Sequence, residues 1–271
     1  MMRRAQPWLG TLVDISVDHA NGAQAINAAF AAVALVQRLM SFHEPGSDVS
    51  RFNRASPGAL VQVDPHTWTV LQLAQQVMAA SDGSFNPACA PRLVAWGYLP
   101  APSPVAVQFV PGQAGYALED EQRVRKTSAA WLDLGGIAKG YAVDLAMAAL
   151  VEHGVGTACV NAGGDLRVIG PDAWPVTLRA PADPGAAGLH LALRDAALAT
   201  SGVYFSSKQI GAHAVSALLD GRCGQALTAA ASVTVIAPRC VLADALTKVV
   251  MASGDAGHPC LAQFGASALI I

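Results

Sequence analysis

The sequence predicts an α+β fold, and three observations support that prediction. With 53% hydrophobic and 13% charged residues, the 271-residue chain has enough apolar surface for a large core. Segments that alternate like strands are mixed with segments of helical periodicity. They do not follow the regular strand-helix-strand spacing of a doubly wound sheet. We expect one domain over residues 1–271, formed by two interleaved lobes whose boundary the sequence does not mark.

The first half of the chain contains more helix than strand. Alternating apolar side chains indicate the first strand, and apolar side chains at helical spacing indicate the helices. A polar loop with a Pro-Gly pair separates the two helices, and Ser47 or Asp48 is expected to begin a short turn within it. The expected elements are a strand over Trp8–Val17, a helix from Asn21 to Met40, the polar loop over 41–54 and a helix over His66–Ala80.

The second half is richer in strands. Short β-branched runs bounded by glycine or proline indicate most of them. The expected elements are a Pro-rich connector over 100–111, a hairpin between Tyr116 and Asp133, a strand end, glycine turn and helix over 132–154, a strand-turn-strand over 158–170, two short strands over 190–205, a strand over 232–238, a helix over 243–254 and a final strand within 261–271.

Charge and composition exclude several function classes. The formal net charge is −2 and the Lys and Arg residues are scattered, so we expect no nucleic-acid partner. The two most apolar stretches, 23–40 and 133–151, are interrupted by polar residues such as Gln37 and Lys139. We therefore expect buried helices and no membrane insertion.

The N-terminus and the cysteines bear on cellular location. Arg3 and Arg4 are not followed by an apolar segment of the kind found in signal peptides, and no lipoprotein cysteine is visible. The five cysteines are widely spaced and form no C-x-x-C pair, as expected for reduced thiols. We expect a cytoplasmic protein, or a periplasmic one if the true start lies upstream.

The strongest chemical signal is the segment DLGGIAKGYAVD, residues 133–144, in which two glycines precede a helix. Free N–H groups at the start of a helix attract phosphate, and Lys139 adds a cation in the first turn. The spacing matches neither a P-loop nor a G-x-G-x-x-G fingerprint. The alternative interpretation is a tight turn in which the glycines serve packing alone.

This segment resembles the signature of the FAD:protein FMN transferases, the ApbE family. Further segments resemble family motifs in the family's order along nearly the whole chain. They are PWLGTLVDISV, MSFHEPGSDVSRFNR, DGSFNPACAPRLVAWGY, NAGGDLRVIG, ATSGVYF, LLDGRCG, SVTVIAP and ADALTKVV. The resemblance implies an ApbE-like (T-fold-like) α+β fold of mixed and antiparallel sheets with packed helices, and FAD in a cleft between the lobes.

The resemblance also implies an activity. Family members bind FAD, use Mg²⁺ or a similar divalent cation at its diphosphate, and transfer FMN to a Thr or Ser hydroxyl of an acceptor flavoprotein, with release of AMP. This chemistry needs charge neutralisation and a positioned nucleophile, which a cation and helix-start amides supply. The implied partners are FAD and that flavoprotein.

Several residues lie at family positions that contact FAD. Asp133 and Lys139 are two of them, and a helix cap and an exposed helix lysine are their structural alternatives. His43 replaces an aromatic residue that packs on the flavin, although a loop histidine more often faces solvent. The nucleotide-contacting tripeptide corresponds to Ser84, Phe85 and Asn86, where Asn replaces Asp and Phe85 is equally well explained by core packing.

The metal position of the family departs from its usual sequence. Gly136 lies where a backbone carbonyl ligates the metal, and Asp244 corresponds to the metal-binding aspartate. Four residues later the family's threonine ligand is replaced by Lys248, and Thr247 is a weaker candidate. Asp244 and Lys248 share a helix face, so they form either a surface ion pair or a site where the ammonium takes over part of the metal's work.

The largest departure is in LLDGRCG, which matches the family pattern H-x-x-D-P-R-T-G. The histidine thought to act as the base falls on Ala217, while Asp220 and Arg222 are retained. His213 is four residues away along an extended chain, roughly 13 Å at about 3.3 Å per residue, and does not substitute without rearrangement. A missing base costs on the order of 10² to 10⁴ in rate.

Two other functions therefore stay open beside the transferase. One is an FAD pyrophosphatase, in which water replaces the acceptor hydroxyl and the products are FMN and AMP. The other is a flavin-binding protein without turnover, which Ala217 and Lys248 suggest. AMP release separates both enzymes from the binder, and covalent flavin on a second protein separates the two enzymes.

Overall fold

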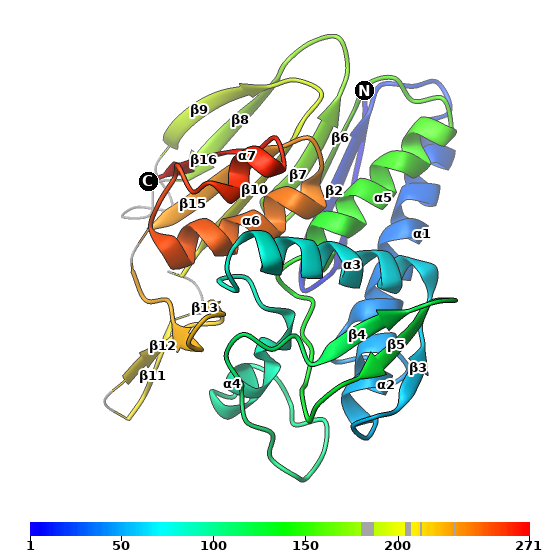
Figure 1. The fold of residues 1–271 in the computed structure, drawn as a ribbon. Coiled ribbons are helices and arrows are strands. Elements are labelled where there is room, and N and C mark those ends of the chain that lie inside the picture. Colours follow the sequence, from blue (N-terminus) through cyan, green and yellow to red (C-terminus); the bar gives the residue numbers. More distant parts are fainter. Residues whose placement is uncertain (180–186, 204–206, 212, 230) are drawn as a thin grey trace.

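The computed structural model describes residues 1–179, 187–203, 207–211, 213–229 and 231–271. A seven-stranded antiparallel sheet forms the centre of the molecule, with strand order β1-β2-β6-β7-β10-β15-β16 (Figure 1). The α+β prediction is confirmed, because neighbouring strands are antiparallel and the helices pack on the sheet. The strands are β1 Met2–Trp8, β2 Thr11–Val17, β6 Ala158–Ala162, β7 Asp165–Ile169, β10 Ala197–Gly202, β15 Ser232–Ala237 and β16 Ser267–Ile270.

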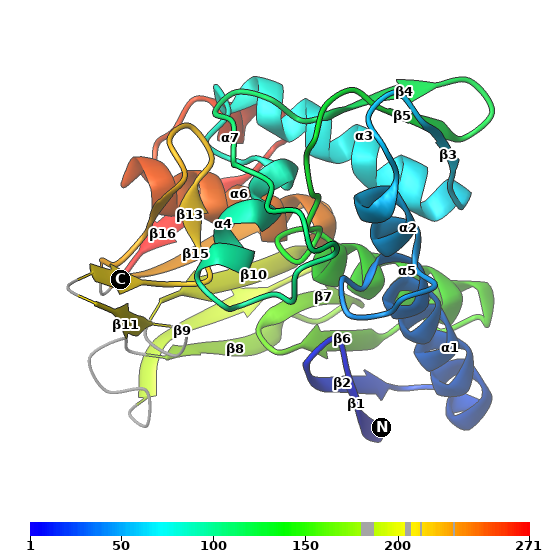
Figure 2. The same cartoon turned by 90° about the horizontal axis from the view of Figure 1, so that it is seen from below.

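Three long helices lie against one face of this sheet (Figures 1 and 2). They are α1 Gly22–Met40, α5 Ala138–Glu152 and α6 Cys240–Ser253. Each ends or begins as the sequence predicts within a few residues, and Gly254 ends α6 in the left-handed conformation. By length and composition α1 is long and apolar enough to cross a membrane. In this structure Ile26, Phe30 and Val33 of α1 are buried in a core shared with α5.

The remaining elements form a second group beside the sheet. Helix α3 crosses above α5 and α6, and a three-stranded sheet of order β3-β5-β4 packs beside it (Figures 1 and 2). The elements are α2 Asp48–Arg54, β3 Leu60–Gln62, α3 Pro65–Ala80, the 3-10 helix η1 Pro87–Cys89, α4 Ala90–Ala95, β4 Tyr116–Glu119, β5 Arg123–Lys126 and α7 Cys260–Gln263. The predicted hairpin between Tyr116 and Asp133 is the β4–β5 pair.

Three short hairpins complete the chain. The hairpin of β8 Trp174–Arg179 and β9 Ala187–Leu193 covers the other face of the main sheet, where Leu178 and Leu193 contact Leu166 and Leu198. The other two hairpins pair β11 Lys208–Ile210 with β12 His213–Val215, and β13 Leu219–Asp220 with β14 Gln225–Ala226.

The structure corrects several element predictions. The single strand over Trp8–Val17 is a hairpin, because Leu9 and Gly10 have φ of 56° and 71° and reverse the chain between β1 and β2. The polar loop over 41–54 contains α2, which the Ser47 side chain caps by accepting from Ser50 N at 3.0 Å. No strand precedes the glycine turn, and α7 precedes the final strand.

Helices α5 and α6 cap each other. Both carboxylate oxygens of Asp144 in α5 accept the first N–H groups of α6, from Cys240 and Val241 at 3.0 Å. Asp244 in α6 accepts the N–H of Gly140 in the first turn of α5, also at 3.0 Å. A carboxylate at a helix start complements the helix dipole. The two helix starts are therefore held in fixed positions relative to each other.

Candidate active site

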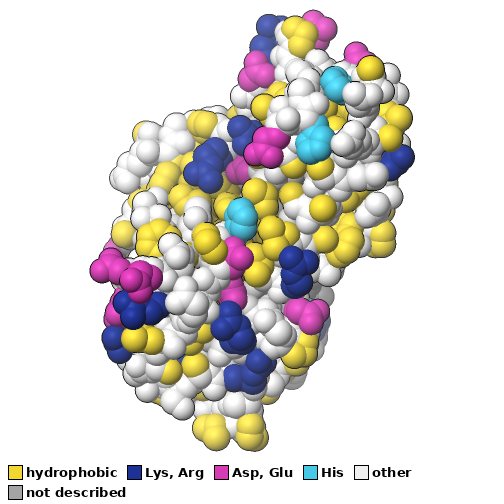
Figure 3. Space-filling model, turned by 90° about the vertical axis from the view of Figure 1, so that its right-hand side faces the viewer, with side chains coloured by type: hydrophobic (Ala, Val, Ile, Leu, Met, Phe, Trp, Pro, Cys, Tyr) yellow, Lys and Arg dark blue, Asp and Glu magenta, His cyan; other side chains and the backbone are white. Residues whose placement is uncertain are grey.

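The described residues form a cleft of about 1440 Å³ between the main sheet and the second group of elements. Cavities that bind drug-sized ligands have volumes of about 300–1,000 Å³, so this cleft accepts a larger ligand. On the molecular face drawn in Figure 3, Lys and Arg side chains lie among acidic, hydrophobic and other side chains instead of forming one basic area. This face therefore presents no continuous basic surface to an anionic ligand.

The predicted glycine turn forms part of the cleft wall, and Asp133 shapes it. The Asp133 carboxylate accepts the N–H of Gly135 at 3.1 Å, and the backbone N–H of Asp133 donates to Pro87 O at 2.9 Å. Asp133 thus caps the turn itself and not the helix, whose first residue is Ala138. Burial raises the pKa of the Asp133 carboxyl, although the Gly135 N–H, His43 and Lys248 act in the opposite direction.

Asn53 fixes the chain just before this turn. Its side chain accepts the N–H of Leu132 at 2.7 Å and donates to the carbonyl of the same residue at 2.9 Å. Asn53 is buried on α2, 79 positions away in sequence. A buried amide with both partners satisfied holds two segments in one register. The early polar segment and the glycine turn are therefore one structural unit.

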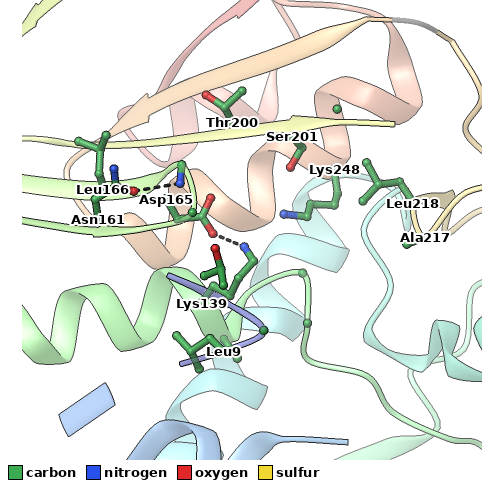
Figure 4. A pocket seen from close by; sticks show the side chains of 18 of the residues that line it. Leu9, Lys139, Asn161, Asp165, Leu166, Thr200, Ser201, Ala217, Leu218 and Lys248 are labelled. Atoms are coloured by element: carbon green, nitrogen blue, oxygen red, sulfur yellow. Dashed lines mark hydrogen bonds and ion pairs between the residues drawn. The ribbon is translucent and has the colours of Figure 1, made fainter. Parts of the chain in front are cut away.

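Lys139 connects α5 to the β6–β7 turn. Its ammonium pairs with Asp165 at the start of β7 and lies 3.5 Å from Asp244 Oδ1 (Figure 4). The alternative of an exposed helix lysine is wrong, because 31% of its side chain is exposed and both neighbours are buried carboxylates. Burial lowers the pKa of Lys139, but the attraction of Asp165 and Asp244 is larger and raises it above its usual value. Lys139 therefore stays charged.

Lys248 reaches the same carboxylate from α6. Its ammonium pairs with Asp244 Oδ1 and donates to the backbone carbonyl of Asp244 at 2.9 Å. Figure 4 shows its side chain extending toward Lys139 and Asp165. The interpretation as a surface ion pair is wrong, because the Asp244 side chain is 0% exposed and that of Lys248 is 12% exposed.

The two carboxyl groups of this cluster differ in acidity. Burial and the charge of Asp244 raise the pKa of Asp165 to about 6, against the opposing effect of Lys139 and Lys248. Burial also raises the pKa of Asp244, but Lys139, Lys248 and the Gly140 N–H outweigh it and lower that pKa to about 2. Asp244 therefore stays ionised in mildly acidic solution, where Asp165 takes up a proton, and at neutral pH both groups are largely ionised.

The hydroxyl of Thr247 has partners other than the Asp244 carboxylate. Its hydroxyl donates to the Asp244 backbone carbonyl at 2.7 Å and pairs with the Ser201 hydroxyl, also at 2.7 Å. Thr247 is fully buried, whereas Ser201 and Thr200 on β10 line the cleft (Figure 4). Thr247 therefore orients Ser201 from behind the cleft wall.

The predicted tripeptide is in the cleft wall, but its polar groups serve the local turn. The Ser84 hydroxyl donates to Ser81 O at 2.9 Å, and the Asn86 side chain accepts from Ala88 N at 2.8 Å to cap η1. Phe85 is 5% exposed, belongs to the core and also lines the cleft, so both interpretations of Phe85 hold. His43 is exposed at the cleft edge and contacts Phe42 edge-on, with ring centroids 6.4 Å apart.

Ala217 lines the cleft, but its predicted neighbours do not. Asp220 and Arg222 pair at 2.7 Å outside the described lining, and Arg222 also contacts Ala252 O. The N–H of Gly221 donates to Ser84 O at 2.9 Å, which fixes this hairpin against the tripeptide. His213 is exposed on β12 and is not among the lining residues that the structure describes, which leaves His43 as the histidine of that lining.

The residues around Asp244 do not fit a divalent cation. Asp244 Oδ1 is engaged by two ammonium groups and Oδ2 by a backbone N–H. Two like unit charges 4 Å apart repel by about 4 kcal/mol at an effective dielectric of 20, so two lysines strongly disfavour a dication here. Within the described ranges, no three His, Cys, Asp or Glu side chains converge as ligands.

Two side chains that organise this site are not among the residues predicted to contact FAD or a metal. Asp165 lies in the segment NAGGDLRVIG, and only the structure shows that it is the ion-pair partner of Lys139. Asn53 and its role in holding Leu132 had no local sequence signal, because the contact spans 79 positions. Tyr204, in the segment ATSGVYF that resembles a family motif, lies outside the described residues.

Comparison with known proteins identifies a single family. The family model described as "ApbE family" matches residues 9–270. An FAD:protein FMN transferase of Rhodobacter capsulatus is 29% identical over 96% of this chain and 53% of its own length, so the chain spans about half of that relative. An FAD:protein FMN transferase of Treponema pallidum is 28% identical over 93% of this chain and 78% of its own length.

The fold is also found among solved structures. The crystal structure of the ApbE protein from Thermotoga maritima superposes with a TM-score of 0.86 at 27% identity, covering 100% of this chain and 94% of that one. The flavin transferase ApbE from Vibrio cholerae gives a TM-score of 0.85 at 24% identity, over 100% and 93% of the two chains. The second likeness concerns the fold alone.

Proposed function

Because this chain belongs to the ApbE family, we propose that it transfers the FMN part of FAD to a threonine or serine hydroxyl of an acceptor flavoprotein and releases AMP. The relatives named FAD:protein FMN transferase support this activity. The observation that carries the proposal is the cleft itself. Its volume suits a dinucleotide, and the ammonium groups of Lys139 and Lys248 line it beside the glycine turn.

The chemistry assigned to the cleft is attack on a phosphorus atom. The acceptor hydroxyl attacks the phosphorus of the FMN phosphate, the bond from that phosphorus to the oxygen of the AMP phosphate breaks, and AMP leaves. The hydroxyl proton passes to solvent or to a nearby base. Charge stabilisation by preorganised donors is the main contribution a protein makes to such a step. Lys139 and Lys248, held by buried carboxylates, are donors of this kind.

The divalent cation that the family implies is not part of this proposal. The donor set at Asp244 is already neutralised by two lysines, so no step is assigned to a metal ion. The base is likewise left unassigned, because Ala217 occupies the position of the family histidine. The acceptor protein is defined here only by its exposed threonine or serine.

The experiment combines the purified chain with FAD and a flavoprotein domain that carries an acceptor threonine, in Mg²⁺ and separately in EDTA. AMP is quantified and both proteins are weighed by intact mass spectrometry. We expect AMP and one FMN added to the acceptor in equal amounts, and no addition to a control acceptor with Thr→Val. AMP without protein flavinylation indicates the pyrophosphatase instead. FAD binding with neither product indicates a binder without turnover.

A further inference from the structure

The cleft wall presents ammonium groups in front of the carboxylate that they neutralise. Lys139 and Lys248 line the cleft, whereas Asp244 does not line it and has a fully buried side chain. The ammonium groups belong to α5 and α6, the two helices that cap each other. A ligand entering the cleft therefore meets fixed positive charge before it meets Asp244.

We propose that the Lys248 ammonium is a built-in cation for the FAD diphosphate, so that this chain binds FAD without a divalent metal ion. This inference rests on the proposed function and deepens it, because it concerns the same site. It replaces the family's metal by a side chain of the protein.

The geometry of Lys248 suits a phosphate oxygen. An ammonium has three N–H donors, and two are directed to Asp244, one to the backbone carbonyl at 2.9 Å and one to Oδ1. The third remains for a ligand in the cleft. Because both internal partners are on the preceding turn of the same helix, the ammonium is held in place before the ligand arrives, which reduces the entropic cost of binding.

The stem of Lys248 lies against the glycine turn. A Cβ added to Gly136 would meet Lys248 Cε at 3.4 Å and Phe85 Cε2 at 3.6 Å. The missing side chain at Gly136 thus allows the lysine stem, the aromatic ring and the turn to pack closely. A diphosphate seated on the turn would therefore lie beside Lys248.

The burial of Asp244 explains why its charge is not available to a metal. A carboxylate without access to the cleft cannot exchange Lys248 for a hydrated dication without breaking both internal bonds of that ammonium. Mg²⁺ also dehydrates reluctantly and prefers octahedral oxygen ligands. A threonine in place of Lys248 would remove the ammonium from Asp244 Oδ1 and add a hydroxyl that could bind a metal ion.

The test is FAD affinity, measured by flavin fluorescence titration in EDTA and in Mg²⁺. For the unmodified chain we expect the two affinities to agree within about two-fold. For Lys248→Thr we expect a loss of about ten-fold or more in EDTA, as for the loss of a hydrogen bond to a charged group, and recovery in Mg²⁺. Lys248→Arg should keep metal-independent binding.

Two controls separate local from general effects. Arg123→Gln removes a positive charge on β5, outside the described cleft lining, and should leave FAD affinity unchanged in both buffers. Mn²⁺ binding followed by electron paramagnetic resonance should be absent in the unmodified chain and present in Lys248→Thr. Thermal unfolding checks that Lys248→Thr is folded; if it is not, the comparison of buffers for the unmodified chain and Lys248→Arg decides.

Three results would overturn the inference. They are FAD binding by the unmodified chain only in Mg²⁺, stoichiometric Mn²⁺ binding by that chain, or undiminished affinity of folded Lys248→Thr in EDTA. Each of these leaves the transferase proposal standing. Failure to bind FAD in either buffer contradicts the proposed function itself, so the two outcomes are distinguishable.

Discussion

Asp244 shows how one side chain organises this cleft. Its carboxylate accepts the Gly140 N–H at the start of α5. The same carboxylate forms ion pairs with Lys139 of α5 and Lys248 of α6, so it links the two helices. A buried carboxylate is stable only when it is hydrogen-bonded and paired, and this one is both. The positions of the two lysines in the cleft therefore depend on a residue that does not itself reach the cleft.

Ala217 lies in the cleft at the position where the resemblance to the family predicts a histidine base. It is exposed and lines the cleft, so a larger side chain can be added without removing a core contact. A positioned general base contributes about 10²- to 10⁴-fold. We expect Ala217→His to raise the rate of FMN transfer by about 10²-fold at neutral pH, with little change in FAD affinity, as measured by single-turnover AMP release.

The matched control for this change is Ala217→Gln. Glutamine is similar in size and polar, but it does not take up a proton at neutral pH. An equal gain in both variants would indicate improved packing in the cleft. No gain in either would mean that another group already accepts the proton.

Among the elements, α5 and α6 determine the site through their close approach. A Cβ on Gly140 would lie 2.3 Å from Cys240 O and 2.8 Å from Asp244 Cβ. Only glycine allows the first turn of α5 to come this near to α6. The sequence places Gly140 in a glycine-rich segment. The structure shows that a glycine is required there because α5 and α6 are in contact at this position.

We expect Gly140→Ala to destabilise the protein although alanine is the better helix former. Overpacking of this kind costs about 1–3 kcal/mol in the free energy of unfolding, which exceeds the roughly 1 kcal/mol gained from helix propensity. Urea denaturation followed by circular dichroism measures the change. Gly156→Ala is the control, because a Cβ there has no neighbour within 4 Å. Equal stability of Gly140→Ala and the unmodified chain would refute the packing argument.

At the scale of the whole molecule, the cleft is assembled from segments that are far apart in the chain. Residues from the β1–β2 turn, the early polar segment, the glycine turn, β10 and α6 all line it. The main sheet and the helices across one face hold these segments in place (Figures 1 and 2). The ionisation of groups in the cleft therefore depends on the folded state of the whole chain, and it contributes to the free energy of unfolding.

The pKa of Asp165 gives this link a measurable form. It is raised to about 6 in the folded chain, against about 3.9 in an unfolded one. Between these values the folded state binds more protons than the unfolded state, so stability falls as pH rises from about 4 to about 6. We expect a loss of about 3 kcal/mol over this window relative to Asp165→Asn, which lacks the titrating proton.

Urea denaturation of both proteins at several pH values tests this expectation. The quantity to compare is the slope of unfolding free energy against pH, since Asp165→Asn also weakens the partner of Lys139 at every pH. Parallel pH profiles for the two proteins would mean that the Asp165 proton is not held as the structure indicates.

Local pattern predicted much of the secondary structure. The helices α1, α3, α5 and α6 and the β6–β7 hairpin agree with their predictions, because periodicity and caps act over a few residues. The part of edge strand β1 that precedes Trp8 was missed, since most of its side chains are exposed and show no alternation of burial. Helix α2 was hidden in a polar loop because several of its buried side chains are polar, Asp48 and Asn53 among them, and apolar periodicity does not reveal these.

The sequence by itself determined the α+β class and the family, because these follow from periodicity and from motifs in a fixed order. Only the tertiary structure decided whether Asp244 and Lys248 form a surface ion pair or a buried charged cluster. Their spacing fits a surface ion pair equally well, and burial against Lys139 and Gly140, 104 positions from Asp244, makes them a charged cleft wall. Burial and electrostatic environment depend on residues distant in sequence, and no local pattern contains them.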